Sequence, residues 1–497
     1  MKRISFMLLA SAVALALLPS CKKKSSSETT VQSTPAYQIG QPISPGNLAA
    51  GSYKGTMTSG NTYNLTGDPF IIPAGDTVLI QKNVHVCVGP NVTIIVKGVL
   101  ISLGTQQDPN WITACGTNKV DLIGLNPNAD PAYSMKWTGI NCDTTCTLLD
   151  LQWTHVEFCG ASFTQNEPCN GCPSGTTSWS IFFQNGKGDC IFTDSWLYGG
   201  IDDAVRFAGG RIYFARNTIE KMGLLGGDGL NAKHGTQGDM AYNLFVGMCT
   251  NSTKCSDKGS GNMVQCNINM YNNTYVDCGY RNSQYGPRGS DIDYEQGGRG
   301  LCYNNLIVNC RNGIRIGMGL NQIPPPDTTN TIVGYNYIYA DSGHEVNQMY
   351  PVVAGTWTKP MAYVIPTQAQ FNLPTNFYWP CCNPNSGNDL PYNDSTSLAA
   401  VNKPLFKNFP LPEPVAGFNL SAIASVETGV AVTGSAYDFH LMPGSPGIGA
   451  GYAGFRAFAN ITNPVTSDVT NSNYAPTVTQ PGVDMGCYQT NGSGNMH

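Results

Sequence analysis

Ala215-Arg216-Asn217-Thr218-Ile219 is the first of five similar segments in which an Asn precedes a short, mostly apolar run. The other four segments are Ala241-Tyr242-Asn243-Leu244-Phe245, Asn272-Asn273-Thr274-Tyr275-Val276, Asn304-Asn305-Leu306-Ile307-Val308 and Tyr335-Asn336-Tyr337-Ile338-Tyr339. The aligned Asn residues, from Asn217 to Asn336, follow one another at steps of 26, 30, 32 and 31 residues. The runs are β-branched and aromatic, are punctuated by Gly and Asn, and lack helical periodicity. This repeat indicates a solenoid in which each period is one coil.

A single coil of three short strands cannot bury its own apolar face. Coils stacked about 4.8 Å apart give every backbone group a partner and form a continuous core. An Asn at the equivalent corner of each coil tolerates left-handed backbone dihedrals and stacks its amide on the next one. We therefore interpret the repeated Asn as a structural ladder rather than as a functional site.

A column of sulfur-containing residues follows the ladder. Met222, Cys278 and Cys310 come five residues after the repeated Asn, and Cys249 comes six after it. We expect this column to face the core. Cys278 and Cys310 lie one coil apart, within the roughly 4.4–6.8 Å between Cα atoms that a disulfide requires. Buried free thiols explain the pair equally well.

The N-terminus has the features of a bacterial export signal. A basic start precedes an apolar stretch over residues 4–18, which is shorter than the about 20 residues that span a bilayer. Cys21 follows Leu18-Pro19-Ser20, and this sequence resembles a lipobox, in which the Cys is acylated. We therefore predict a signal peptide over residues 1–20, lipidation of Cys21 and a flexible tether over residues 21–49. The predicted location is the outer membrane, on its periplasmic or cell-surface face.

The composition of the chain limits its possible partners, its compartment and its number of domains. The net charge is -5, with 12% charged residues and 56 Gly. A mildly acidic chain does not attract nucleic acid, so we expect no nucleic-acid partner. The 18 Cys residues fit an oxidising compartment outside the cytoplasm, where disulfides form. Uniform composition favours one repetitive domain over residues 50–490 rather than several unrelated domains.

Several short sequence segments resemble motifs of right-handed parallel β-helix proteins of the pectin-lyase-like kind. These segments are Ile72-Pro73-Ala74-Gly75-Asp76-Thr77, Trp137-Thr138-Gly139-Ile140, Gly199-Gly200-Ile201-Asp202-Asp203, Asn402-Lys403-Pro404-Leu405-Phe406, Asp438-Phe439-His440-Leu441, Gly444-Ser445-Pro446 and Asp484-Met485-Gly486. The resemblance covers most of residues 50–490. It implies an all-β fold, namely one elongated right-handed parallel β-helix with N-terminal and C-terminal caps, in a lipoprotein of Gram-negative bacteria. It also implies a polysaccharide or cell-surface glycan as partner, although one fold hosts many functions.

Acidic residues recur at similar positions in three coils. Counting back from the repeated Asn without gaps aligns residues 202–207, 228–233 and 290–295, and it also aligns Gly209-Gly210-Arg211 with Gly297-Gly298-Arg299. This alignment places one set of carboxylates on the face that carries Asn231, Lys233 and His234, with Lys258 from the coil between. The carboxylates are those of Asp202, Asp203, Asp228, Asp291, Asp293 and Glu295.

Carboxylates this close repel one another unless one is protonated or a cation is shared. Clusters of oxygen ligands suit Ca²⁺, so the six acidic residues are the predicted metal ligands. Bound Ca²⁺ would neutralise a uronate carboxylate while Lys233 removes the neighbouring proton. The sequence therefore predicts a polysaccharide lyase with Lys233, His234 and Asp203 as catalytic residues. The predicted substrate-binding residues are Arg206, Asn231, Arg299 and Arg315.

A glycoside hydrolase is one alternative. Asp202-Asp203, His234-Gly235 and Arg315-Ile316 resemble fragments of polygalacturonase motifs, in which two carboxylates act as acid and base. The leading Asn-x-Asp and the first Gly of Gly-His-Gly in that family are missing here.

The other alternative is a non-catalytic glycan-binding protein, or a structural or adhesive surface lipoprotein. In that case Asp and Gly turn the chain between strands, and Arg206, Arg211 and Arg299 neutralise the carboxylates in surface ion pairs. Long loops over residues 165–177 and 350–397, with aromatic residues such as Trp357, would wall a polar groove beside sugar rings.

Overall fold

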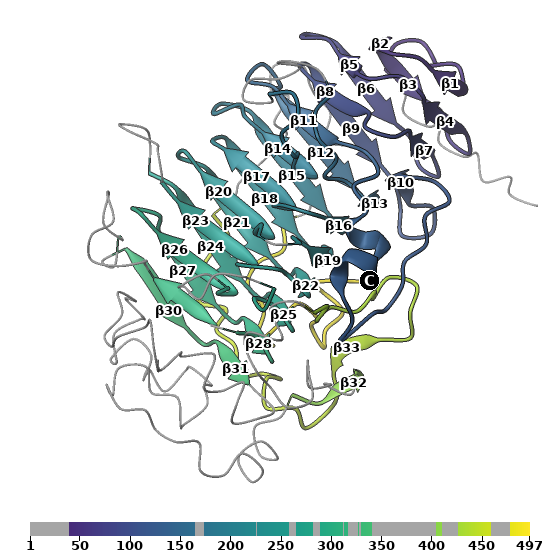
Figure 1. Cartoon of the computed structure of the whole chain (residues 1–497). Helices are drawn as coiled ribbons and strands as arrows, with labels where there is room; N and C mark the ends of the chain where they lie inside the picture. The colour runs from purple at the N-terminus through teal and green to yellow at the C-terminus, as the bar shows by residue number, and fades with distance from the viewer. Residues whose placement is uncertain are drawn as a thin grey trace, which may run out of the picture. The chain divides into compact units, whose positions relative to one another are not determined.

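The computed structural model describes residues 39–164, 173–224, 226–257, 265–281, 289–311, 313–316, 327, 330–339, 404–409, 426–458 and 478–497. Within these ranges the chain winds through three parallel sheets, and each strand pairs with the strand three places along the chain (Figure 1). Every three strands therefore make one coil. The predicted all-β parallel β-helix is confirmed.

The strands are short and belong to three sheets, which we name in the order in which a coil visits them. The first sheet contains β1 (Gly46–Leu48), β4 (Thr62–Leu65), β7 (His85–Val88), β10 (Asn110–Thr113), β13 (Thr154–Glu157), β16 (Trp196–Gly200), β19 (Thr218–Met222), β22 (Leu244–Val246), β25 (Thr274–Val276), β28 (Leu306–Val308) and β31 (Tyr337–Tyr339). The second sheet contains β2 (Gly51–Ser52), β5 (Phe70–Ile72), β8 (Thr93–Val96), β11 (Gly139–Cys142), β14 (Ile181–Phe183), β17 (Val205–Ala208), β20 (Leu230–Lys233), β23 (Thr253–Ser256), β26 (Ile292–Glu295) and β29 (Ile314–Ile316). The third sheet contains β3 (Gly55–Met57), β6 (Thr77–Ile80), β9 (Val99–Leu103), β12 (Leu148–Gln152), β15 (Asp189–Thr193), β18 (Arg211–Ala215), β21 (Gln237–Ala241), β24 (Asn267–Tyr271), β27 (Gly300–Tyr303) and β30 (Thr331–Gly334).

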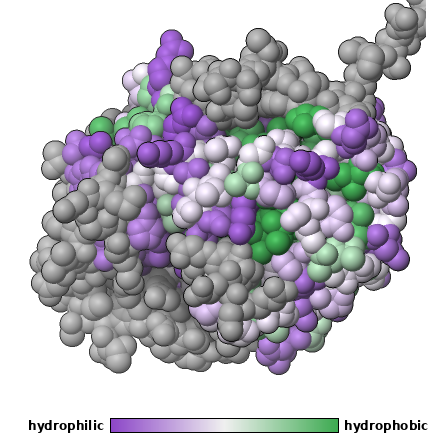
Figure 2. All heavy atoms as spheres, turned by 90° about the horizontal axis from the view of Figure 1, so that it is seen from above, coloured by the Kyte–Doolittle hydropathy of each residue, from purple (hydrophilic) through white to green (hydrophobic). Residues whose placement is uncertain are grey.

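A few elements lie outside the coils. Two 3-10 helices, η1 (Pro127–Ala129) and η2 (Pro131–Tyr133), follow β10, and β32 (Phe406–Asn408) pairs antiparallel with β33 (Asp438–Leu441). No helix in the described part of the chain is long and apolar enough to cross a membrane. In the space-filling view of one face, hydrophobic residues form separate patches among hydrophilic ones (Figure 2).

The solenoid begins earlier than the sequence predicted. β1 lies inside the segment assigned to the tether, because Leu48 is buried and pairs in register with Leu65 of β4. The signal peptide, Cys21 and the tether up to residue 38 lie outside the described residues.

Like residues stack on one another inside the coils. Phe192 and Phe214 are register partners on β15 and β18, with ring centroids 4.8 Å apart and planes tilted by 9°. Phe245 and Tyr275 stack in the same way between β22 and β25, at 5.0 Å. Because side chains alternate along a strand, the residues directly before and after each stacked ring point outward and are free to be polar.

The Asn ladder is confirmed at the corner between the third and first sheets. Asn217 Nδ2 donates to Asn243 Oδ1 at 2.9 Å, and Asn243 Nδ2 donates to Asn273 Oδ1 at 3.0 Å. The series continues at 3.1 Å and 2.9 Å through Asn305 to Asn336. All five side chains are buried.

The backbone conformation at this corner differs from the prediction by one residue. The left-handed residue is the one that precedes each ladder Asn, as at Arg216 (φ 60°), Tyr242 (φ 58°) and Asn304 (φ 59°). The ladder Asn itself is thereby turned inward, where its amide reaches the next coil.

The sulfur-containing column faces the core as predicted. Met222, Cys249, Cys278 and Cys310 are fully buried. Cys278 and Cys310 are free thiols, and the Cys278 N–H donates to Cys310 Sγ at 3.5 Å. A disulfide does occur in the first coils, between Cys87 and Cys115, whose Cα atoms are 5.1 Å apart.

The C-terminal segments return to the outer face of the first sheet. Asn495 Nδ2 donates to the carbonyl of Asn217 at 3.0 Å, and His497 Nδ1 lies 2.8 Å from Thr218 Oγ1. Farther along, Arg281 and Glu427 form a fully buried ion pair at 2.9 Å. The outer face of the first sheet is therefore covered by the chain itself in these coils, whereas the second sheet carries the predicted site.

Candidate functional site

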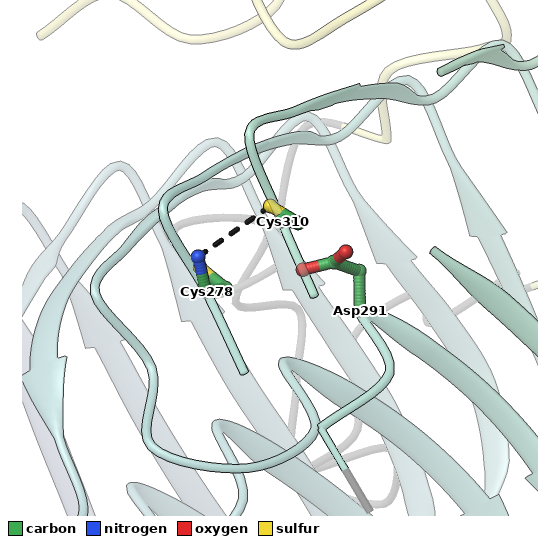
Figure 3. A group of neighbouring side chains, drawn as sticks. All are labelled: Cys278, Asp291 and Cys310. Atoms are coloured by element: carbon green, nitrogen blue, oxygen red, sulfur yellow. Dashed lines mark hydrogen bonds between the residues drawn. The ribbon is translucent and has the colours of Figure 1, made fainter. Parts of the chain in front are cut away.

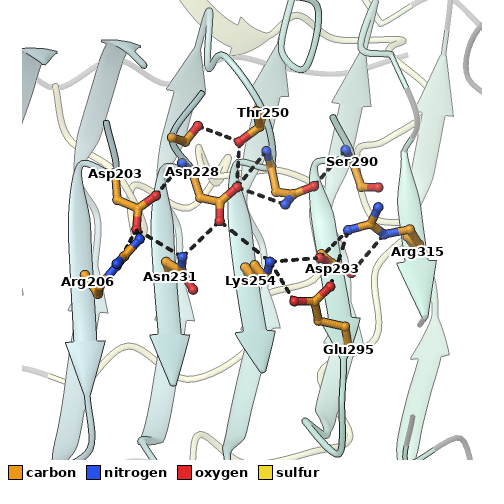
Figure 4. Close-up of polar contacts among 12 residues, drawn as sticks. Asp203, Arg206, Asp228, Asn231, Thr250, Lys254, Ser290, Asp293, Glu295 and Arg315 are labelled. Atoms are coloured by element: carbon orange, nitrogen blue, oxygen red, sulfur yellow. Dashed lines mark hydrogen bonds and ion pairs between the residues drawn. The ribbon is translucent and has the colours of Figure 1, made fainter. Parts of the chain in front are cut away.

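Polar side chains follow one column on the outer face of the second sheet. Strand register pairs Arg206 with Asn231, Asn231 with Lys254, Lys254 with Asp293, and Asp293 with Arg315. Each residue comes from a different coil, through β17, β20, β23, β26 and β29 in turn (Figure 4). Their strand neighbours, such as Val205 and Phe207, are buried. The alternation of apolar and polar residues thus produces a continuous polar column.

A second ladder stands at the corner where the chain enters the second sheet. Asp203 Oδ1 accepts the N–H of Asp228 at 2.7 Å, and Asp228 Oδ1 accepts the N–H of Asn251 at 3.2 Å. Asn251 Oδ1 in turn accepts the N–H of Ser290 at 3.1 Å. Two of the predicted acidic residues therefore join coils, as the repeated Asn does at its own corner.

Asn231 connects this ladder to the column. Its Nδ2 lies 3.0 Å from Asp203 Oδ2 and 3.0 Å from Asp228 Oδ2. Thr250 Oγ1 adds a hydrogen bond of 2.6 Å to Asp228 Oδ1. The Asp228 carboxylate is thus held in one orientation by several donors.

Every carboxylate of the column and its ladder faces a cation. Arg206 binds Asp203 at 2.7 Å, and Arg315 forms an ion pair with Asp293. Lys254 Nζ lies 2.7 Å from Glu295, 3.9 Å from Asp228 and 4.0 Å from Asp293 (Figure 4). The Lys254 side chain is 13% exposed and that of Arg206 is 27% exposed. Cations and anions alternate in a largely buried network.

The pKa values reflect this network. Burial alone would raise the pKa of Asp228, but Lys254 and the hydrogen bonds from Thr250 and Asn251 hold it below its ordinary value. Burial raises the pKa of Asp293 to about 6, with a further contribution from Glu295 that Arg315 and Lys254 oppose. The pKa of Lys254 is raised by the surrounding carboxylates, against the effect of burial. Lys254 is therefore a permanent cation, whereas Asp293 gains a proton at a higher pH than an ordinary aspartate does.

Lys233 differs from the basic residues of the column. It ends β20, in register with Ala208, and is half-buried. None of the carboxylates in the described ranges forms an ion pair with it. Burial, followed by the nearby charges of Arg206 and Lys254, lowers its pKa. Lysine with a lowered pKa and an unengaged amine is suited to act as a base.

An aromatic platform borders the column at its N-terminal end. Phe182 is the register partner of Arg206, and Trp179 lies 4.4 Å from Phe182 between ring centroids. The Arg206 guanidinium lies 4.3 Å from the centroid of the Trp179 ring. Such a cation–π contact fixes the guanidinium while part of it stays exposed.

Asp291 does not belong to the predicted face. It is fully buried, where Ser252 Oγ donates to its Oδ1 at 3.2 Å, and burial raises its pKa well above the ordinary value. Asp293 and Glu295 alternate outward within β26, but Asp291 precedes that strand. At the corner the backbone turns, so the alternation that places Asp293 and Glu295 outward does not extend to Asp291.

The ungapped alignment was wrong by one residue in the coil of Asp203. The turn from β20 to β21 has three residues, whereas the turn from β17 to β18 has two. Asp203 is therefore the equivalent of Asp228, and Asp202 lies before the ladder, where its Oδ1 accepts the N–H of Asp203 at 2.9 Å. A slip of one residue exchanges the two faces of a strand.

The remaining predicted residues occupy other places. His234 lies in the turn after β20 with φ 53° and is half-buried. Arg299 precedes β27 and pairs with Asn267, which aligns it with Arg211 at the start of a strand of the third sheet. The matched Gly-Gly-Arg segments predicted this alignment. Arg299 therefore lies away from the column, which belongs to the second sheet. Lys258 and the loop aromatics, including Trp357, lie outside the described residues.

Sequence reasoning missed Lys254, which is central to the network. Counting back from the repeated Asn without gaps selected Lys258, because such a count ignores the longer connection between β23 and β24. Comparing Leu230-Asn231-Ala232-Lys233 with Thr253-Lys254-Cys255-Ser256 would have found it, since both alternate inward and outward residues.

The described geometry gives no support for Ca²⁺ at this column. Among the described residues, the six predicted ligands form no group of three within metal-sharing distance. The Lys254 ammonium lies among Asp228, Asp293 and Glu295, where a shared cation would be expected. Calcium binding stays a prediction.

Comparison of the chain with protein-family models, curated proteins and solved structures gives no match.

Proposed function

We propose that this protein is an exported, lipid-anchored β-helix protein that binds an acidic polysaccharide on the outer face of its second sheet and cleaves it by β-elimination. The observation that carries the proposal is the amine of Lys233, which forms no ion pair with a described carboxylate and whose pKa is lowered by burial and by the charges of Arg206 and Lys254. A uronate-containing glycan is the substrate class that matches these cations. Binding to such a glycan and its cleavage are separate parts of the proposal.

The chemistry needs a neutralised carboxylate and a base. Arg206 is the most exposed cation of the column, and it would hold the uronate carboxylate and so acidify the neighbouring carbon. The Lys233 amine would then accept the proton from that carbon. The carbon–oxygen bond to the next sugar breaks, a carbon–carbon double bond forms, and the leaving oxygen takes a proton from water. In this scheme protein cations do what Ca²⁺ was predicted to do.

The same geometry favours elimination over hydrolysis. Asp203, the residue that matched the polygalacturonase fragments, accepts the Asp228 N–H and binds Arg206. A glycoside hydrolase needs a carboxyl group that is free to donate a proton to the leaving oxygen, and the Asp203 carboxyl is occupied by these two contacts. We therefore rank the hydrolase below the lyase.

Assays with polygalacturonate, alginate and glucuronate-containing glycans test the proposal. We expect ultraviolet absorbance of an unsaturated product, and we expect Lys233→Ala to lower the rate by about 100-fold or more, as for other lost acid–base groups. Lys187→Ala is the matched control, because Lys187 is an exposed lysine in the turn from β14 to β15, at the same corner of an earlier coil.

The pH profile gives a second readout. Because the lysine must be neutral to act, the rate should rise with pH with an apparent pKa below that of an ordinary lysine. Reducing ends without unsaturated product would indicate a hydrolase. Binding on a glycan array without any cleavage would leave the non-catalytic glycan-binding protein as the function and refute the lyase.

A further inference from the structure

Three side chains meet inside the solenoid at the corner between the first and second sheets. Cys278 follows β25, Cys310 follows β28, and Asp291 precedes β26 (Figure 3). One potential ligand atom from each lies within 4.8 Å of the other two. All three residues are fully buried. This cluster is on the core side of the coils and is separate from the polar column.

The Asp291 carboxyl has an unusual environment. Its Oδ2 atom is buried and accepts no hydrogen bond within the described residues. No Lys or Arg of the described chain forms an ion pair with it, in contrast to Asp203, Asp228 and Asp293 of the column. A buried carboxyl normally has a cation or donors at both oxygens, because an unpaired one destabilises the fold. Asp291 therefore lacks a cationic partner.

The two sulfur atoms have polar neighbours in the backbone. The Cys278 N–H donates to Cys310 Sγ at 3.5 Å, so the two residues are in direct contact across neighbouring coils. Each thiol also lies near a carbonyl two residues earlier, Val276 O at 3.1 Å and Val308 O at 3.2 Å. These carbonyls accept the thiol protons when no metal is bound, and those protons would be released on binding.

We propose that Cys278, Cys310 and Asp291 bind one zinc ion inside the solenoid. Two thiolates and one carboxylate form a ligand set that suits Zn²⁺ and is too soft and too small for Ca²⁺. The Ser252 hydroxyl, which donates to Asp291 Oδ1, orients the carboxylate so that Oδ2 is available. The three side chains would supply three of the four ligands of a tetrahedral Zn²⁺ ion. Because all three are fully buried, a substrate could not reach the ion, and its role would be structural.

The ion would link two neighbouring coils, because Cys278 and Asp291 flank the connection from β25 to β26 and Cys310 follows β28 of the next coil. Its ligands come from one turn that ends β25, one that ends β28 and one that begins β26. Metal binding would therefore add to the free energy of unfolding of this region, since the site does not exist in the unfolded chain.

Metal analysis of the purified full chain tests the proposal. We expect about one Zn²⁺ per chain by elemental mass spectrometry, and a metal-free sample should bind Co²⁺ with the charge-transfer absorption of a thiolate complex. Asp291→Asn and Cys310→Ser should lower the affinity for Zn²⁺ by more than about 10-fold, since even outer-shell partners have effects of that size. Cys302→Ser is the matched control, because Cys302 is a free thiol buried in the same interior but outside the cluster.

Two measurements keep the test independent of variant folding. A chelator should lower the Tm of the wild type and leave that of Asp291→Asn unchanged. Alkylation of the unfolded, unreduced wild type should modify both Cys278 and Cys310. A disulfide-linked peptide containing both residues would overturn the proposal, and so would a chain without bound metal that does not take up Zn²⁺ or Co²⁺. None of these results depends on glycan cleavage, so this proposal and the proposed function fail separately.

Discussion

Lys254 is the residue on which the charge balance of the column depends. Its ammonium lies within 4.0 Å of carboxylate oxygens from Asp228, Asp293 and Glu295. A buried ion pair contributes little by itself, but removal of one partner leaves an uncompensated charge at a cost of about 3–5 kcal/mol. The column is therefore both a candidate binding surface and a part of the structure whose charges depend on one another.

Asn243 provides a test of the ladder at the scale of one residue. Its side chain accepts the backbone N–H of Asn217 at 3.1 Å and donates to the Phe214 carbonyl at 3.1 Å. Asn243→Ala leaves these buried groups without partners, at about 1–3 kcal/mol for each. We therefore expect the free energy of unfolding, measured in urea, to fall by about 3 kcal/mol or more.

Asn64→Ala is the control for that prediction. Asn64 Nδ2 also donates to an Asn one coil away, Asn47, at 3.1 Å, but this pair is exposed. The change should be within about 0.5 kcal/mol, as for most surface substitutions. Equal losses for the two variants would contradict a special role for the buried ladder.

At the scale of single elements, aromatic rings form a stack along the outer face of the first sheet. His155 on β13 lies 3.6 Å from the Trp111 ring of β10 and 4.0 Å from the Trp196 ring of β16, in planes tilted by 3° or less. Its Nδ1 lies 3.0 Å from Glu157, which also binds Lys119 at 2.7 Å. The imidazole is therefore enclosed on both faces and along one edge.

This stack makes stability depend on pH. Burial lowers the pKa of His155 to about 4, with smaller contributions from Lys119 and His85 that Glu157 opposes. The folded state thus holds a neutral imidazole, and the unfolded chain gains the proton first as the pH falls. The contribution of the neutral His155 imidazole to the free energy of unfolding is complete above a pH of about 6.5. It is lost as the pH falls towards about 4, by up to about 3 kcal/mol.

Urea unfolding of the wild type and His155→Gln across this range checks the prediction. The variant should lose the share of the pH dependence that belongs to His155, while His497, whose pKa burial lowers to about 3, keeps its own share. His85→Gln, at the exposed end of the same stack, should keep it. An unchanged slope in His155→Gln would show that other groups cause the dependence.

The sequence predicted the elements better than it predicted their register. The repeated Asn marks one corner in every coil, so the coils and their core-facing residues could be predicted. The turn after β20 has one residue more than the turn after β17, and a count without gaps cannot detect this. Asp291 was misplaced because the backbone turns at the corner before β26. Lys254 was missed because the connection from β23 to β24 is longer than in the neighbouring coils. Both features are set by the folded coil.

At the scale of the whole molecule, lipid attachment would determine where the solenoid acts. Three acyl chains on Cys21 would exceed the two signals that stable anchoring needs. We expect the full-length protein to incorporate labelled palmitate and to remain in the membrane fraction, and we expect Cys21→Ser to abolish both. Ser25→Ala is the control. Label that persists in Cys21→Ser would contradict lipidation at this position.

The docking of the C-terminus on the first sheet has a kinetic consequence. Asn495 and His497 contact Asn217 and Thr218, which lie 278 and 279 residues earlier in the chain. Each coil, by contrast, needs only its neighbour and can form as soon as that neighbour exists. Contacts of such long range form slowly, so we expect the coils to assemble first, before His497 stacks on the Trp196 ring at 4.0 Å between centroids.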